Sequence, residues 1–590
     1  MPFDAFVLNA VSDEITDRLI KTGERVSKIF QINQELIISF RSENSSDSLF
    51  FSVHPQSCRI HFTERHYSHP LTPPAFCMLL RKHLLGGLLI SLEQPPLERV
   101  LYLNFSAPNR EGKEVIKTLV LEVMGKHSNL ILLDAPAKEG GKMILGAIKP
   151  VSPNINRIRT ILPHHHYSPP PLQEKLHPFA LSYEVFVNEP DLSAGEPLEQ
   201  ALIENIQGIS PFLAKETAAR AGSGFLSDKT AKQVWNALQE LMEIYITKNW
   251  APTLISDQAG NPSDYSAFKP SQPITGQLRG HPSISKVLDE FYQFKEKNDA
   301  KKALTGLLNQ QLSQMLKKII KKEKAQLQEL KEAKNAEQLK LCGELIILHL
   351  QKIPPRASEI NLTNLYGSDN EEVKVSLDPR LNPALNAQRY FKLYRKARQA
   401  EKKMTERLEQ TRQEITYLES VSFSIEKADY PALLEIKDEL EEAGFLAVRG
   451  KPGPPPQKKT ALFNPHRYYA SLGEEIYVGK NNRQNEHLVQ KFAFKTDLWL
   501  HVKDIPGAHV IIRSRNPGGE TIREAALLAA YYSKASGSSN VPVDFTQVKN
   551  IKRHPAGKPG MVIYTNHKTI YVTPEEQLLR PILTRTRPPK

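Results

Sequence analysis

The stretch between Ile476 and Arg513 is the most informative about function, because polar side chains that could bind a ligand are grouped in it. A strand-like stretch ends at Gly479, and six residues rich in amide and cationic donors follow it: Lys480, Asn481, Asn482, Arg483, Gln484 and Asn485. Such donors suit phosphate oxygens and the edges of nucleobases. Two alternating, strand-like segments come next and carry four more polar side chains: His501, Lys503, His509 and Arg513. We expect these ten residues to form an RNA-binding surface.

Catalytic groups are not evident from the sequence. The chain lacks the GxSxG, HExxH and GxxxxGK[ST] motifs, so neither a hydrolase nor an ATPase is supported. His501 and His509 flank a turn and could hold a metal, but a third ligand is not evident, which favours RNA contact or packing in a sheet. We predict no catalytic residue, no metal site and no cofactor.

The N-terminus supplies the one enzyme hypothesis. Pro2 would become the first residue after removal of Met1, and a secondary amine there is the nucleophile of formamidopyrimidine-type DNA glycosylases. Those enzymes place a carboxylate after the proline, where this chain has Phe3. They also carry a four-cysteine zinc finger, whereas this chain has three scattered cysteines. Glycosylase activity is therefore a minor alternative.

Composition points to a basic, multidomain protein of a reducing compartment. The 590 residues carry a formal net charge of +13, and residues 461–590 hold 19 Lys and Arg against 10 Asp and Glu. A polyanionic partner fits this excess, with a solubilising surface as the alternative. The scattered cysteines and the absence of a long uncharged apolar run favour a cytoplasmic location without a membrane partner.

The first 282 residues predict two modules. Alternating runs at 35–40, 100–105 and 129–134 indicate an antiparallel sheet, and helices are expected at 13–19 and 73–87. Residues 202–241 have helical periodicity, and Ser210 followed by Pro211 predicts a helix start. The GIS turn before it resembles a helix-hairpin-helix module, and a neutral helical spacer is the alternative.

Two helical segments, 285–340 and 387–420, have coiled-coil character. In the second, Met404, Leu408, Thr411, Ile415 and Leu418 form a heptad seam. The prolines between the segments exclude one continuous helix. We expect an antiparallel coiled-coil arm with a small middle domain; spacing or dimerisation is the alternative role. About 50 helical residues would reach about 75 Å.

The chain as a whole resembles the RqcH/NEMF family of ribosome quality-control factors. The resemblance rests on residues 123–133 and 478–510 and on the order of the modules. It implies a multidomain α+β fold with these parts: 1–172, a formamidopyrimidine-glycosylase-like α+β NFACT-N domain that binds tRNA; 173–282, the helix-hairpin-helix module; 283–440, the coiled-coil arm with its insert at 341–383; 441–460, a Pro/Lys linker; and 461–590, the α+β NFACT-R RNA-binding domain.

The resemblance also implies function and partners. Members bind an obstructed large ribosomal subunit, through its rRNA and proteins, while it holds a nascent peptidyl-tRNA. They recruit alanyl-tRNA, so tRNA-Ala is the expected species, and the stalled chain receives a template-free alanine tail that marks it for degradation. The ribosome supplies the chemistry. A fibronectin-binding surface adhesin, suggested by an older family name, is the alternative from another class.

The resemblance places tRNA contacts in the N-terminal domain. Glu98 and Arg99 stand where the family has an Asp-Arg pair before a strand, and an isolated surface ion pair is the alternative. Lys126 and His127 follow Gly125 in a second matching segment and offer donors to tRNA. A third match would set Arg81 and Lys82 on a helix surface, with Cys77 in the core.

Overall fold

The computed structural model describes residues 3–41, 46–67, 70–109, 111–136, 141–171, 174–188, 197–227, 230–271, 276–333, 335–364, 366, 371–446, 463–555, 557–585 and 587. The chain divides into two compact units, Met1–Asn298 and Asp299–Lys590. Within the described residues, none of the helices combines the length and the apolar character that crossing a membrane requires.

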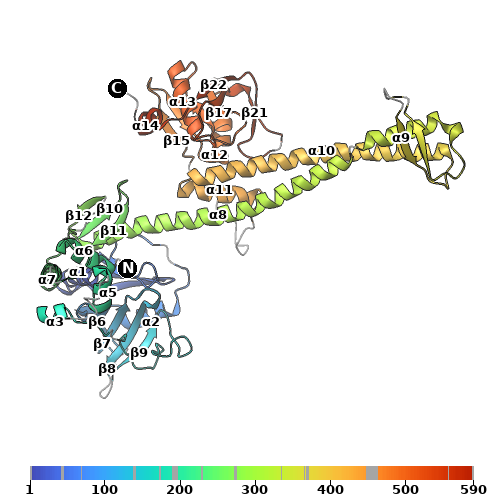
Figure 1. The fold of residues 1–590 in the computed structure, drawn as a ribbon. Helices are drawn as coiled ribbons and strands as arrows, with labels where there is room; N and C mark the ends of the chain where they lie inside the picture. The colour runs from blue at the N-terminus through green and yellow to red at the C-terminus, as the bar shows by residue number, and fades with distance from the viewer. Residues whose placement is uncertain are drawn as a thin grey trace. The chain divides into compact units, whose positions relative to one another are not determined.

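A nine-stranded antiparallel sheet forms the centre of the first unit (Figure 1), in the order β4-β3-β2-β1-β5-β6-β7-β8-β9. The strands are β1 (Arg25–Ile32), β2 (Glu35–Arg41), β3 (Ser46–Ser52), β4 (Arg59–Phe62), β5 (Leu88–Glu93), β6 (Val100–Pro108), β7 (Glu114–Glu122), β8 (Asn129–Pro136) and β9 (Lys142–Ala147). The three strands predicted from alternation lie within β2, β6 and β8, and those predictions are confirmed.

Two helices pack with this sheet: α1 (Ala5–Ile15), continued by the π-helical turn η1 (Thr16–Ile20), and α2 (Ala75–Leu84). Asp4 starts α1, because its Oδ1 accepts hydrogen bonds from the backbone N–H groups of Phe6 and Val7. The prediction of a helix over 13–19 therefore placed the start too late. The predicted helix within 73–87 is confirmed as α2.

A helical module with a three-stranded sheet follows in sequence. It contains α3 (Tyr183–Asn188), α5 (Leu198–Asn205), α6 (Pro211–Ala221), α7 (Ala231–Thr247), β10 (Thr253–Ser256), β11 (Pro262–Ser266) and β12 (Gln277–Gly280). As predicted, Ser210 caps α6 by accepting from the Leu213 N–H at 3.2 Å. One hydrophobic cluster, including Phe6, Leu97 and Tyr245, joins the module to the nine-stranded sheet, so the two pack as one body.

The long helix α8 (Ile284–Ala333) begins in the first unit and continues into the second. Its start is fixed to β4, where Arg59 pairs with Glu296 at 2.8 Å and the His61 ring lies 3.4 Å from Asp289. Burial lowers the pKa of His61 to about 4. The His61 ring is therefore neutral at physiological pH.

The second unit contains an antiparallel coiled coil, as predicted. Its helices are the remainder of α8, then α10 (Pro383–Lys427) and α11 (Tyr430–Glu442). Leu308 and Leu312 of α8 pack with Leu418 and Val421 of α10 in one cluster. Farther along α8, Glu323 accepts a hydrogen bond from Arg412 of α10 at 3.0 Å. A later residue of α8 thus contacts an earlier residue of α10, so the two helices are antiparallel.

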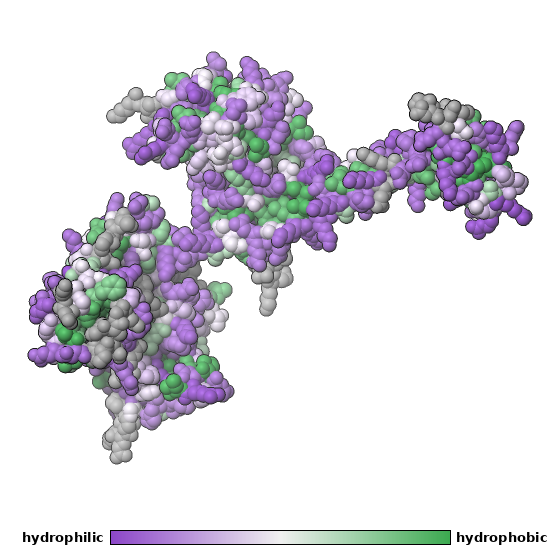
Figure 2. All heavy atoms as spheres, in the orientation of Figure 1, coloured by the Kyte–Doolittle hydropathy of each residue, from purple (hydrophilic) through white to green (hydrophobic). Residues whose placement is uncertain are grey.

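Between α8 and α10 lies the small domain expected from the prolines. It consists of α9 (Ala336–Leu348), the 3-10 turn η3 (Leu350–Lys352) and a hairpin of β13 (Glu359–Thr363) and β14 (Glu372–Ser376). Hydrophobic residues show at its surface, as the α9 end of the arm in Figure 2 illustrates, and Ile347 and Leu348 are among the exposed ones.

A C-terminal α+β domain completes the second unit. Its sheet has the order β15-β16-β18-β17-β19-β22. The elements are β15 (His466–Tyr469), β16 (Glu475–Val478), α12 (Asn482–His487), η4 (Leu488–Phe492), β17 (Leu498–Val502), β18 (Val510–Ile512), α13 (Gly519–Tyr531), β19 (Val541–Gln547), η5 (Val548–Asn550), β20 (Ile551–Arg553), β21 (Val562–Tyr564), β22 (Lys568–Val572) and α14 (Glu576–Thr584). Most of the predicted linker, from residue 447 onward, lies outside the described residues.

Candidate RNA-binding sites

A cleft of about 400 Å³ in the first unit contains the predicted Glu98-Arg99 pair. Its lining comes from the N-terminal domain and the helical module and comprises Asp4, Ala5, Leu97, Glu98, Arg99, Met124, Pro170, Pro171, Lys175, Ile203, Gln207, Gly208, Ile209, Ser210 and Pro211. The two modules therefore build one concave surface, and neither provides it alone.

A close backbone approach fixes the loop that presents the pair. Leu97 has a φ of 59°, and its N–H donates to the Tyr245 hydroxyl at 3.2 Å. Gly208, in the turn before α6, has a φ of +77°, and a Cβ there would lie 2.5 Å from the Leu97 Cβ. Only glycine tolerates both conditions, so Gly208 lets the helical module close against the loop.

Glu98 is half-buried and held at both its side chain and its backbone. Its Oε1 accepts from Gln207 Nε2 at 2.6 Å, and its carbonyl accepts from Gln94 Nε2 at 2.8 Å. Glu98 has a longer side chain than the aspartate of the family pair, and it thus reaches Gln207 in the helical module. This contact fixes the carboxylate in the cleft.

Arg99 brings positive charge to the same cleft. Its carbonyl accepts from the Val123 N–H at 2.9 Å, which ties it to the end of β7. Burial raises the pKa of Asp4, and the nearby charge of Arg99 opposes that rise. Ser210 donates to the same carboxyl group at 2.8 Å. Asp4 thus links α1, α6 and the surroundings of Arg99.

The turn with Lys126 and His127 starts next to the cleft. It is the 3-10 turn η2 (Gly125–His127), and both side chains are exposed. The turn is anchored because the Met124 N–H, at the cleft, donates to the Ser128 hydroxyl at 2.8 Å. The two predicted tRNA-contact segments therefore meet at one place.

Arg81 and Cys77, two other predicted positions of the first unit, have structural roles. Arg81 donates to the Ile29 carbonyl at 2.8 Å, Lys82 is exposed, and Cys77 is fully buried as predicted. Glu122 is buried, pairs with Arg159 and accepts from the Tyr167 hydroxyl at 3.0 Å. Glu122 therefore stabilises the fold.

The glycosylase hypothesis receives no support from the N-terminus. Pro2 lies outside the described residues, and Phe3 is buried in the core with 1% exposure. The phenylalanine is thus a packing residue at the place where a glycosylase has its carboxylate.

The polar loop of the C-terminal domain lies against α10 and α11. Lys480 Nζ donates to Asp429 at 2.9 Å, and Arg483 pairs with Glu442 at 2.6 Å. Asn481 Nδ2 and Gln484 Nε2 both donate to Glu435, at 2.6 and 2.9 Å. Asn482 Nδ2 donates to the Ser420 hydroxyl at 3.0 Å. Four carboxylate contacts therefore occupy donors that the sequence analysis assigned to RNA.

Asn485 has a different role within the C-terminal domain. It is buried, and its Oδ1 accepts from the His509 N–H at 3.0 Å. A Cβ at Gly479 would come within 2.1 Å of this oxygen, so the glycine of the strand end leaves room for it.

The histidines form part of an aromatic cluster. The His501 and His509 rings are 5.2 Å apart, and both contact Trp499. Burial lowers the pKa of each, which keeps them neutral. Lys503 is exposed, whereas Arg513 stacks on Phe492 and Phe494 and pairs with Asp497 at 3.5 Å. No cluster of three metal-ligand side chains occurs among the described residues.

Three further residues of the cleft were not predicted from the sequence: Lys175, Gln207 and Gly208. Lys175 Nζ is oriented by the Ile203 carbonyl at 2.8 Å. The GIS turn was the available signal for Gly208. Its closeness to residue 97 depends on a contact between segments about a hundred residues apart, which no local pattern carries.

Two family models match the chain, and they divide it between residues 459 and 464. Residues 4–459 match the model of the NFACT N-terminal and middle domains, and residues 464–566 match that of the NFACT protein RNA binding domain. The Rqc2 homolog RqcH of Bacillus subtilis is 34% identical over 98% of both chains, and so is that of Streptococcus pneumoniae. A solved structure, the C-terminal part of the fibronectin/fibrinogen-binding protein of Streptococcus suis, is 36% identical, with a TM-score of 0.38 over 48% of this chain and 98% of that one. The chain belongs to the NFACT family, as a ribosome quality-control factor of the RqcH type.

Proposed function

We propose that the protein binds obstructed large ribosomal subunits that still carry a nascent peptidyl-tRNA, and recruits alanyl-tRNA to them. It then directs template-free alanine tailing, which marks the stalled chain for degradation. The observation that carries this proposal is the cleft, where Arg99, Lys175 and the fixed Glu98 meet beside the exposed Lys126-His127 turn.

Each side chain has a role that its chemistry suits. The Arg99 guanidinium can contact a phosphate or a guanine edge in two places, and the Glu98 carboxylate can accept from a base amino group. Lys126 and His127 would contact the tRNA backbone. We interpret the N-terminal domain as a glycosylase-like platform and α5-α6 as a helix-hairpin-helix. The ribosome would form the peptide bond.

The second unit would contact the large subunit through its coiled-coil arm and RNA-binding domain, in the cytoplasm. RNA contact by the 480–485 loop stays a prediction. It would require the loop donors to exchange their carboxylate partners on α11 for phosphates.

Sedimentation combined with mass spectrometry tests the proposal. In a density gradient, the protein should accompany free large subunits, and a stalled reporter from the same cells should end in alanine tails. Deleting the gene should remove the tails. Equal occupancy of intact ribosomes, or tails that persist in the deletion strain, would contradict the proposal.

A further inference from the structure

Four exposed lysines lie around one junction in the C-terminal domain: Lys491, Lys495, Lys549 and Lys552. The Lys549 N–H donates to the Lys495 carbonyl at 3.1 Å, which joins the two segments. Because a chain spans at most about 3.6 Å per residue, the Cα of Lys491 is within about 14 Å of that of Lys495. By the same limit, Lys552 is within about 11 Å of Lys549. Gln490, next to Lys491, lines the same hollow as Lys552, so the four lysines lie around one region.

The two segments that carry these lysines contain few carboxylates of their own. Segments 488–497 and 547–554 contain one acidic residue, Asp497, which is buried. Its Oδ2 accepts from the Phe494 N–H at 2.8 Å and faces Arg513. The neighbouring Glu486 pairs with Arg553 at 3.1 Å. Both carboxylates thus have arginine partners, and the exposed lysines of the two segments are placed to meet an external anion.

An aromatic ring stands among the lysines. Phe494 is 62% exposed, which leaves part of its ring open to a stacking partner. The Arg513 guanidinium lies 4.4 Å from its ring centroid and orients it. Beside Lys552, a hollow of about 180 Å³ is also lined by Gln490. Cationic side chains with an exposed ring are the elements that bind single strands, because phosphates meet the cations and a base stacks on the ring.

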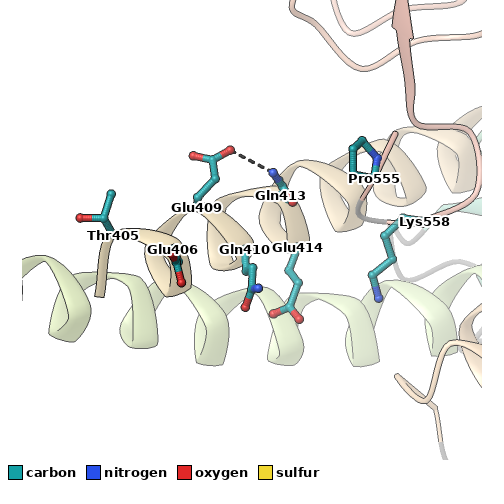
Figure 3. A pocket seen from close by; sticks show the side chains of 8 residues that line it. All are labelled: Thr405, Glu406, Glu409, Gln410, Gln413, Glu414, Pro555 and Lys558. Carbon is teal, nitrogen blue, oxygen red and sulfur yellow. Dashed lines mark hydrogen bonds between the residues drawn. The ribbon is translucent and has the colours of Figure 1, made fainter. Parts of the chain in front are cut away.

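Another hollow of the second unit has the opposite character. It measures about 780 Å³ and is lined by Thr405, Glu406, Glu409, Gln410, Gln413, Glu414, Pro555 and Lys558 (Figure 3). Gln413 donates to Glu409 at 3.0 Å, and Lys558 lies 4.7 Å from the Phe445 ring centroid. Three glutamates against one lysine would repel phosphates.

We propose that Lys491, Lys495, Lys549 and Lys552, with Phe494, form a patch that binds unpaired ribosomal RNA nucleotides. Single-stranded RNA is the occupant because an exposed ring can stack only on a base whose face is free. The patch deepens the proposed function, since it rests on RNA binding by this domain. It differs from the 480–485 loop, whose donors already have partners on α10 and α11.

The test compares full-length variants that lose equal charge. The patch variant carries Lys491→Ala, Lys495→Ala, Lys549→Ala and Lys552→Ala. The control carries Arg515→Ala, Arg523→Ala, Lys534→Ala and Arg580→Ala, four exposed positions of the same domain. Binding to a sixteen-nucleotide oligouridylate and to purified large-subunit RNA is measured across salt concentrations. Circular dichroism checks that each variant is folded.

The patch variant should lower the slope of log affinity against log salt by up to about 3, since each phosphate contact on a single strand contributes about 0.7. Phe494→Ala should weaken oligouridylate binding roughly 5- to 150-fold without changing the slope. Equal losses in patch and control variants would overturn the inference. So would equal binding of a polyglutamate peptide and the RNA.

Deleting residues 461–590 distinguishes two claims: that the C-terminal domain binds RNA, and that the patch is where it does so. If the deletion abolishes binding of the oligouridylate and of large-subunit RNA, and the patch variant does not change it, the patch is wrong and the RNA-binding role of the C-terminal domain stands. If the deletion leaves binding of these two RNAs intact, the RNA-binding role of the C-terminal domain fails.

Discussion

Gln207 Nε2 donates a 2.6 Å hydrogen bond to Glu98 Oε1. This bond connects the helical module to the loop that presents Arg99. Because the module also closes over that loop at Gly208, the position of Arg99 depends on two residues of the helical module, Gln207 and Gly208.

The Gln207-Glu98 bond predicts energetic coupling in tRNA binding. Gln207→Leu removes the donor while keeping a side chain of similar size, and it should weaken tRNA binding roughly 2- to 10-fold, as a bond worth about 0.5–1.5 kcal/mol implies. In a Glu98→Ala background the same change should have little further effect. Filter-binding titrations of the four proteins measure the coupling, and fully additive losses would show that the bond does not matter for tRNA.

Glu98→Asp separates charge from reach. The shorter carboxylate restores the residue of the family pair but draws back from Gln207. If position 98 acts through its charge, tRNA binding should persist in Glu98→Asp and fall in Glu98→Gln. The same titrations check this, and a loss in Glu98→Asp with full binding in Glu98→Gln would point to reach instead.

Gly208→Ala should destabilise the first unit and reduce tRNA binding together. The new Cβ would meet Leu97 at 2.5 Å in a backbone conformation unfavourable for alanine. Gly222→Ala is the matched control, because Gly222 also has a positive φ but no atom lies within 4 Å of its Cβ position. Chemical denaturation should give a loss more than about 1 kcal/mol larger for Gly208→Ala. Equal losses would mean that the contact with Leu97 costs nothing.

Glu435→Ala should loosen the C-terminal domain from α11. Both Asn481 and Gln484 donate to this carboxylate, so its removal leaves two donors without partners. Hydrogen exchange of amides in 482–487 should quicken, while exchange in β17 stays unchanged. Unchanged exchange in 482–487 would show that the remaining contacts hold the domain.

Stability of the second unit should depend on Glu439. Burial raises the pKa of this carboxyl to about 7, while the Tyr417 hydroxyl and Arg483 oppose the rise. A carboxyl group whose pKa is raised in the folded state stabilises the fold at pH values below its pKa in the unfolded chain, which is about 4.5. This contribution to the free energy of unfolding is lost as the pH rises through 7.

Glu439→Gln imitates the protonated carboxyl and avoids this loss. The variant should match the wild type near pH 4.5 and be more stable at pH 8, by up to about 3 kcal/mol. Urea unfolding at both pH values measures the difference. A stability difference that does not change with pH would contradict the assignment.

Helix capping and heptad spacing, which depend only on residues close in the sequence, were enough to predict some elements of the fold. The Ser210-Pro211 start of α6 and the seam of α10 follow from capping and heptad spacing. The start of α1 was missed because Phe6, Val7 and Leu8 are all buried, so the helix shows no polar face in its first turns.

Long-range contacts account for what the sequence could not predict at the sites. Glu98 and Arg99 were found through the family resemblance, whereas Gln207 and Lys175 join them only in the folded chain. The donors of Lys480 and Arg483 looked available in sequence, yet Asp429 and Glu442 lie opposite them in the fold. Ion pairs between distant segments leave no periodic pattern in the sequence, so they could not be predicted from it.

Copurification of tRNA with Arg99→Ala tests the central claim most directly. Arg41→Ala, an exposed arginine at the end of β2, is the control. Losing a two-point arginine contact costs about 1–3 kcal/mol, or roughly 5- to 150-fold in affinity. Arg99→Ala should therefore lose tRNA and alanine tails while still sedimenting with large subunits, and Arg41→Ala should keep all three. Full tRNA yield and normal tails with Arg99→Ala would show that the cleft does not hold the tRNA.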